Sequence, residues 1–143
     1  MPHQLQSPEL QAWAAGFPLA LLHAGVTLVI LVAGAALYAL ITPHREIQLI
    51  REGNSAAAVS FGGMVVALGV PLSVSLASSH SLLEIALWGV ATLFVQLLVF
   101  RLTDLLLHGL PQRIQEGEMS AAVLLVCAKI TTALVLAASV LAA

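Results

Sequence analysis

The segment ITPHREIQLIREGNSAAAV, residues 41–59, is the most polar run in a chain that is otherwise nearly all apolar. Part of the same pattern returns as LLHGLPQRIQEGEMSAAV, residues 106–123. Each segment separates two long apolar stretches, so each is expected to be a polar connection where the chain meets water. We call residues 43–54 the first hinge and residues 108–118 the second hinge.

The first hinge carries the signals of a short helix. Thr42 followed by Pro43 is a helix-start signal, and Gly53 is a helix-stop signal. Ile47 and Ile50 offer an apolar side between them. The first hinge is therefore expected to form a short helix lying at the membrane interface.

The composition places the chain in a lipid bilayer. Of its 143 residues, 60% are hydrophobic and 8% are Asp, Glu, Lys or Arg, whereas soluble domains contain about 25% charged residues. Five Lys and Arg with seven Asp and Glu cannot cover a soluble domain, and they form no basic face for nucleic acid. The single cysteine, Cys127, cannot form a disulfide within the chain and is expected to be buried in the core.

Four apolar stretches are long enough to cross a bilayer, which takes about 20 helical residues. Backbone groups find no other partner in lipid, so each stretch is expected to be a transmembrane helix. The predicted fold is an all-α integral membrane four-helix bundle. The predicted spans are residues 19–41, 56–78, 82–107 and 119–142.

Residues 1–18 are expected to form an extracytoplasmic N-terminal segment. They contain no Lys or Arg and so lack the charged start of a signal peptide. Ser7 and Pro8 are typical of a helix start, and Gly16 and Pro18 are expected to end that helix. The segment is therefore predicted to hold a short interfacial helix.

The two hinges are related by an offset of 64 residues. Over residues 44–59, eight of sixteen positions carry the same residue 64 positions later, as Glu52 and Glu116 do. The chain is thus predicted to be a tandem duplication of a two-helix hairpin, with repeats at residues 19–80 and 81–143. Because each repeat contains two spans, the two copies are expected to run in parallel.

The arginines predict the orientation of the chain. Arg45 and Arg51 lie in the first hinge and Arg113 in the second, whereas the connections at the other membrane face contain no Lys or Arg. The positive-inside rule then places both hinges in the cytoplasm and both termini in the periplasm.

Three segments carry a resemblance to a known family: ITPHREIQLIREGNSAAAVSFGG, GVPLS and VQLLVF. From about residue 20 onward the chain is similar to the bacterial inner-membrane domain of unknown function 350 family (DUF350, UPF0719). The most specific feature is a Gly-Asn pair followed by small residues, here Gly53, Asn54 and residues 56–58. The second repeat departs from this pattern with Glu118 in place of Asn. The resemblance implies the architecture and a bacterial inner-membrane location, without a reaction.

Several polar or small residues are candidates for structural or functional roles. Asn54 is expected to cap the second span, or to contact a ligand or partner at the cytoplasmic mouth. Gly62, Gly69 and Ser73 share one face of that span and are predicted to form a helix-packing seam.

The remaining candidates are charged residues inside the spans. Arg101 and Asp104 are spaced to pair along one helix near its cytoplasmic end. Lys129 lies about 16 Å beyond Glu118 along an ideal helix, where an unpaired charge is costly. Its candidate partners by depth are Gln96, Asp104 or a residue of an oligomer partner. The sequence leaves open whether Lys129 belongs to a structural pair or lines a polar pathway.

No motif for metal binding, phosphate binding or nucleophilic catalysis occurs, so the chain is predicted to be neither an enzyme nor a cofactor-binding protein. The favoured function is a small homo-oligomeric membrane module that docks a membrane-associated protein partner through Arg45, Arg51 and Arg113. The alternative is a small channel or transporter whose pathway passes Lys129 and the Arg101/Asp104 pair.

Overall fold

The computed structural model describes residues 7–43, 45–79 and 81–143, so predictions for residues 1–6, His44 and His80 lie outside the described residues. Within those ranges the regular structure is entirely helical. The helices are α1 (Pro8–Ile41), α2 (Glu46–Arg51), α3 (Ser55–Ser78), α4 (Leu82–Leu107), α5 (Leu110–Gln115) and α6 (Met119–Ala142).

Four of these helices, α1, α3, α4 and α6, are long and apolar enough to cross a membrane. They contain the four predicted spans, and their ends at the hinges lie within one residue of the prediction. The four-helix all-α prediction is therefore confirmed. The agreement follows from composition, because a long apolar stretch satisfies its backbone in lipid by forming a helix.

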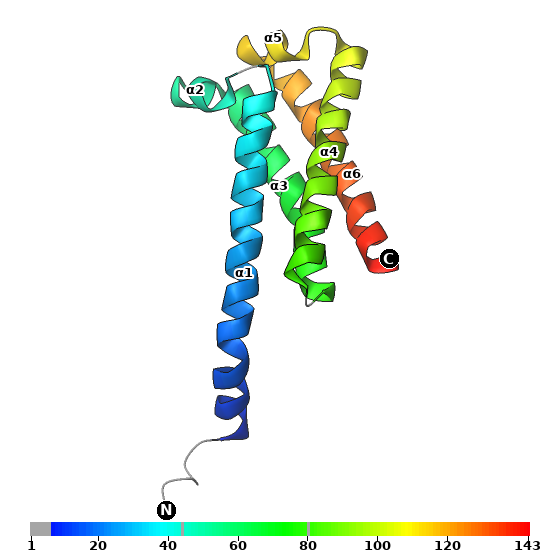
Figure 1. The fold of residues 1–143 in the computed structure, drawn as a ribbon. Helices are drawn as coiled ribbons and strands as arrows, with labels where there is room; N and C mark the ends of the chain where they lie inside the picture. Colours follow the sequence, from blue (N-terminus) through cyan, green and yellow to red (C-terminus); the bar gives the residue numbers. More distant parts are fainter. Residues whose placement is uncertain (1–6, 44, 80) are drawn as a thin grey trace, which may run out of the picture.

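Helix α1 is much longer than the predicted first span. Its 34 residues correspond to about 51 Å at 1.5 Å per residue, and its N-terminal part projects beyond the other helices (Figure 1). The break predicted at Gly16 and Pro18 is wrong, because the helix continues through both. A membrane helix tolerates an internal proline when nearby backbone adjusts to the missing N–H, and Ser7 provides the cap that starts this helix at Pro8.

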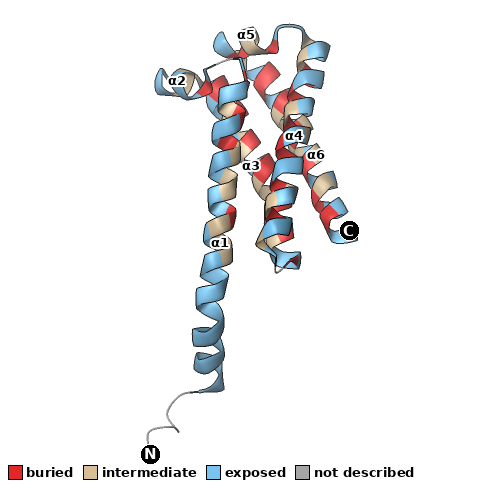
Figure 2. Ribbon diagram, in the orientation of Figure 1, coloured by how far each residue is buried: buried red, intermediate tan, exposed pale blue. Residues whose placement is uncertain are grey.

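The long helices form a bundle with both hinges at one end. In the view of Figure 1, α1 and α4 lie in front of α3 and α6, and α2 extends sideways from the end of α1. The most extensive contact is between α3 and α6, while α1 packs on α3 and α4. The buried residues follow this arrangement: they lie where α3, α4 and α6 meet, whereas the N-terminal part of α1 is exposed (Figure 2).

Both hinges contain a six-residue helix, α2 in the first and α5 in the second. The helix predicted in the first hinge is confirmed, and it ends before Gly53, which has a φ of 87°. Gly117 ends the second in the same way with a φ of 80°. The predicted start signal is wrong, because Thr42 caps the end of α1 instead, and its hydroxyl donates to the Tyr38 carbonyl oxygen at 3.0 Å.

The seam between α3 and α6 is built from small residues, but they are not the predicted ones. Gly62 and Ser73 are exposed, and a Cβ atom at Gly62 would meet nothing within 4 Å. A Cβ atom at Gly69 would meet only Leu31, at 4.0 Å. The close approach is at Gly63, where a Cβ atom would lie 2.4 Å from Val126. The predicted seam is therefore wrong for packing within this chain.

Cys127 is exposed on α6, so the prediction that it belongs to the core is also wrong. Its buried neighbours on that helix are Leu125 and Lys129. Because the outside of a membrane helix is as apolar as its inside, a small apolar residue can face either way.

Candidate functional site

The most unusual feature of the interior is Lys129, whose exposed fraction is 0%. It lies on the buried side of α6, and its Nζ donates a hydrogen bond to the hydroxyl of Tyr38 on α1. The same Nζ lies 3.9 Å from the centroid of the Tyr38 ring and 5.7 Å from that of the Phe100 ring. The two rings meet edge to face with centroids 6.4 Å apart. Two aromatic rings thus surround the lysine head group, which is a favourable environment for a desolvated cation.

Two more polar residues complete the surroundings of the lysine. Glu46, the first residue of α2, is 1% exposed, and its charge acts on Lys129 through space, since no ion pair between the two occurs among the described residues. Gln96 on α4 is fully buried, and its Nε2 donates to the Lys129 carbonyl oxygen at 3.2 Å. We call Tyr38, Glu46, Gln96, Phe100 and Lys129 the lysine cluster. It joins α1, α2, α4 and α6 in the interior.

One member of the lysine cluster, Gln96, was predicted beside Lys129, and the others were not. Gln96 does lie beside it, although the bond reaches the backbone of Lys129. Asp104 does not, and Tyr38 and Glu46 were overlooked. A depth comparison along ideal helices cannot find them, because long side chains cross several ångströms between tilted helices. The available signal was that Tyr38 and Glu46 flank the polar end of the first span.

The predicted ion pair between Arg101 and Asp104 is wrong. No salt bridge between them occurs among the described residues, and Arg101 is exposed on α4. Asp104 instead accepts a hydrogen bond from the backbone N–H of Leu110 at 2.8 Å, through its Oδ1. The carboxylate thereby anchors the start of α5, which satisfies an otherwise unpaired helix N–H.

Asn54 joins the two hinges. Its Oδ1 accepts from the backbone N–H of Ala57 at 3.0 Å, so the predicted cap of α3 is present. Its Nδ2 donates to the carbonyl oxygens of Ile114 at 2.9 Å and Gln115 at 3.0 Å, in the last turn of α5. One side chain therefore caps the second span and holds the second hinge against the first.

The second hinge uses a different residue at the matching position. Glu118 precedes α6 but makes no side-chain cap. Its Oε1 instead accepts from Arg113 at 3.3 Å and from Ser120 at 3.1 Å. The connection between the hinges is therefore made by Asn54 of the first hinge, and Glu118 makes no equivalent contact.

The hinge arginines differ in their surroundings. Arg45 and Arg51 are exposed on the first hinge. Arg113 is half-buried and paired with Glu118. A polar recess of about 270 Å³ lies between the hinges. It is lined by Pro43, Arg45, Gln48, Leu49, Glu52 and Gln115.

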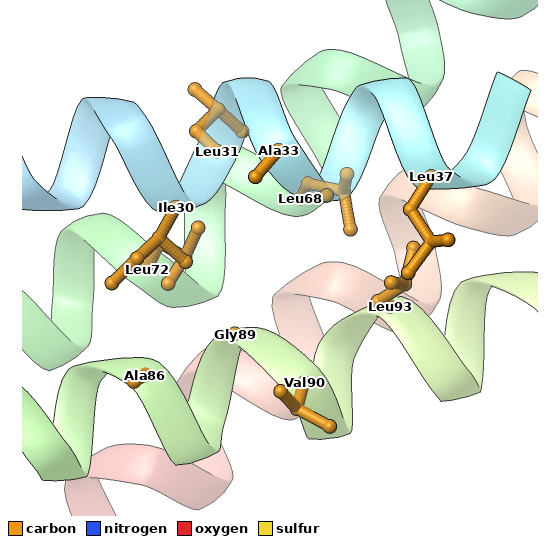
Figure 3. Close-up of a pocket in the computed structure, with 11 residues that line it drawn as sticks. Ile30, Leu31, Ala33, Leu37, Leu68, Leu72, Ala86, Gly89, Val90 and Leu93 are labelled. Carbon is orange, nitrogen blue, oxygen red and sulfur yellow. The ribbon is translucent and has the colours of Figure 1, made fainter.

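Two apolar grooves open on the sides of the bundle. One, of about 240 Å³, runs between α1 and α4 over α3, and its lining residues include Ile30, Leu37 and Gly89 (Figure 3). A Cβ atom at Gly89 would lie 2.8 Å from Ile30, so the glycine allows these helices to approach. The second groove, of about 600 Å³, lies between α1, α2 and α3.

The described residues contain no group of three or more His, Cys, Asp or Glu side chains that could hold a metal ion. The lysine cluster has no exposed opening at Lys129. What the arrangement provides is a buried polar contact between helices, together with a polar face made by the hinges. The fold and these features define a multi-pass helical membrane protein.

Comparison with known proteins identifies the family. Residues 12–140 match the family model described as Domain of Unknown Function (DUF350), and the chain belongs to this family. It is similar to the UPF0719 inner membrane protein YjfL of Escherichia coli (strain K12), with 35% identity over 85 residues. The same values hold for the protein of that name in Escherichia coli O157:H7. The match covers 59% of this chain and 64% of each relative. No solved structure matches the chain.

The predicted family is thus confirmed, and the protein is a multi-pass inner-membrane protein in contact with the lipid bilayer.

Proposed function

We propose that the protein is a non-enzymatic membrane module that docks a membrane-associated protein partner through its two hinges. The observation that carries this proposal is the bridge made by Asn54, which fixes α5 against the start of α3. Two polar helices far apart in the sequence are held as one surface. A surface of fixed shape binds with less loss of conformational entropy than two independent loops.

The exposed side chains of this surface suit a polar partner. We call them the hinge face: they carry both charges and amides, and Arg45, Gln48 and Glu52 among them line the polar recess. The hinge face consists of Arg45, Gln48, Arg51, Glu52, Gln112 and Glu116. Lys129, by contrast, is 0% exposed. A channel or transporter pathway past this residue would need an opening at its side chain, so the burial of Lys129 does not support that alternative.

Photo-crosslinking in the native membrane tests the docking proposal. A photoreactive residue at Gln112, in the hinge face, should yield one discrete crosslinked product. The product should be lost when Arg51→Glu is added, while the protein remains in the membrane at normal level. The matched control is the same residue at Leu83, exposed at the opposite end of the bundle. Equal crosslinking at both positions, or no effect of Arg51→Glu, would contradict the proposal.

We also propose that the module is a homo-oligomer. Gly62 and Ser73 are exposed on one face of α3, and a Cβ atom at Gly62 would meet nothing within 4 Å. Small residues allow close packing of helices in lipid. Mass measurement in mild detergent should give a discrete multiple of 14.9 kDa. Gly62→Leu should shift the mass toward the monomer, and a monomeric wild-type protein would refute the proposal.

The tandem duplication and the orientation belong to the same proposal. In support of the duplication, α2 and α5 each contain six residues and α3 and α6 each contain 24. The second helix of each pair begins and ends 64 residues after the first.

In support of the orientation, the arginines of the hinges have no counterpart at the other face. A reporter fused after Ala143 should read as periplasmic and one inserted at Gly53 as cytoplasmic. The opposite result would invert the topology and remove the cytoplasmic hinge face.

A further inference from the structure

The groove beneath α2 combines an apolar wall with a cationic end. Its walls are the hinge-proximal part of α1 and two residues of α3, and α2 forms its roof. The residues that line it are Leu31, Val32, Ala35, Ala36, Ala39, Leu40, Arg45, Glu46, Ile47, Gln48, Phe61 and Val65. Its volume of about 600 Å³ is within the range of small-molecule sites, about 300–1,000 Å³.

The charged group at the mouth of the groove is Arg45. It is exposed at the start of α2, and Nη1 donates to Gln48 Oε1 at 3.5 Å. No ion pair between Arg45 and a carboxylate occurs among the described residues, so its other guanidinium donors are available. Glu46 also lines the wall, but it is 1% exposed and interacts with Lys129 in the interior. The groove therefore presents a positive charge to its mouth.

The length of the groove matches one membrane leaflet. Leu31 and Leu40 are nine residue steps apart on α1, which corresponds to about 14 Å along a helix. This is close to half of the roughly 30 Å hydrocarbon core of a bilayer. The roof residue Ile47 is 44% exposed, as expected for an apolar side chain in contact with lipid at the interface.

We propose that this groove is a binding site for an anionic glycerophospholipid of the surrounding bilayer. One acyl chain occupies the apolar groove, and the phosphate accepts hydrogen bonds from the Arg45 guanidinium, whose planar donors match phosphate oxygens. The groove between α1 and α4 offers the contrast, because all its lining residues are uncharged and it can select no head group (Figure 3). This site goes beyond the docking proposal, since it concerns lipid selection beneath α2 rather than a protein on the hinge face.

Charge complementarity favours a lipid over a second copy of the chain. A symmetric dimer contact presents the same patch on both sides, and the exposed charge among the described residues that line this groove is Arg45, so a second copy would bring no exposed carboxylate to it. A lipid phosphate instead supplies the opposite charge and places it at the membrane surface, where Arg45 lies.

Native mass spectrometry of the full chain tests the site with two defined lipids, phosphatidylglycerol and phosphatidylethanolamine with identical acyl chains. The wild-type protein should retain one phosphatidylglycerol per chain with about a tenfold preference, because the ammonium group of phosphatidylethanolamine offsets the phosphate charge that Arg45 binds. Arg45→Ala should abolish the preference. Its matched control is Arg101→Ala, which removes an equally exposed arginine from the outer face of α4.

A second pair of variants tests the apolar part of the site. Ala36→Phe fills the groove from an exposed position on α1 and should lower retention of both lipids about tenfold. Ala33→Phe adds the same bulk to α1 but lines the other groove, and should leave retention unchanged. If Ala36→Phe does not give a folded protein, Ala36→Leu provides a smaller obstruction with the same expected direction.

Three results would overturn the proposal. Equal retention of the two lipids by the wild-type protein would remove the head-group selectivity. Equal losses in Arg45→Ala and Arg101→Ala would show a general effect of surface charge. A change of oligomeric mass in Ala36→Phe with unchanged lipid retention would show that a second copy occupies the groove.

Discussion

Replacing Lys129 by methionine is expected to lower the free energy of unfolding by about 1–3 kcal/mol, the usual cost of leaving a buried hydrogen-bonding group without its partner. The lysine is 0% exposed and contacts the Tyr38 hydroxyl and ring. Methionine preserves most of the apolar volume and fills irregular space, so packing accounts for little of the loss. The main loss is the hydrogen bond, because the hydroxyl of the fully buried Tyr38 is left without the lysine Nζ.

A double-mutant cycle separates this hydrogen-bond loss from packing. Tyr38→Phe removes the hydroxyl that contacts Lys129 and keeps the ring. Adding it to Lys129→Met should restore at least about half of the lost stability, because no unsatisfied hydroxyl then remains buried at that contact. The coupling between the two positions should be on the order of 1–3 kcal/mol.

The assay is unfolding by SDS titration in mixed micelles, followed through the fluorescence of the two native tryptophans. Leu124→Met, an exposed change on the same helix, is the control and should alter the free energy of unfolding by less than about 0.5 kcal/mol. The reasoning is refuted if Lys129→Met is as stable as the wild-type protein. It is also refuted if the double variant is no more stable than Lys129→Met alone.

Two further substitutions probe how the hinges and the seam are built, with the same titration as the measurement. Asn54→Ala should cost about 2–4 kcal/mol, because it removes one helix cap and two hydrogen bonds to α5. Asn54→Ser keeps a cap acceptor and should cost less than Asn54→Ala; equal losses would mean that the cap contributes nothing. Gly63→Ala should cost about 1–3 kcal/mol because its Cβ atom meets Val126. Gly25→Ala, in open space on α1, should be neutral or stabilising by up to about 1 kcal/mol, and no difference between the two glycines would contradict the packing described for α3 and α6.

The bounds of the spans could be predicted because they depend on composition and length alone. The start of α6 is residue 119 as predicted, and α3 begins at Ser55 against a predicted 56. The hinges supply clear local signals there, since Asn54 caps α3 and the glycines adopt a positive φ. Where such a signal was weaker than it looked, as at Gly16 and Pro18 in α1, the prediction failed.

The faces of the helices were harder to predict. A transmembrane helix is apolar on every side, so hydrophobic periodicity does not separate the face that packs from the face that meets lipid. The seam predicted at Gly62 therefore lies one residue from the true contact at Gly63. Cys127 was assigned to the core for the same reason and is exposed.

The sequence by itself determined that four helices cross a membrane, where the hinges interrupt them, and that Lys129 needs polar surroundings. These properties follow from local composition and from the cost of burying a charge. Only the tertiary structure decided that Tyr38 and Phe100 surround this lysine, that Asp104 anchors α5, and that Asn54 holds the hinges together. Such contacts depend on the tilt and rotation of each helix. Packing between neighbouring helices sets those quantities, and no local segment of the chain encodes them alone.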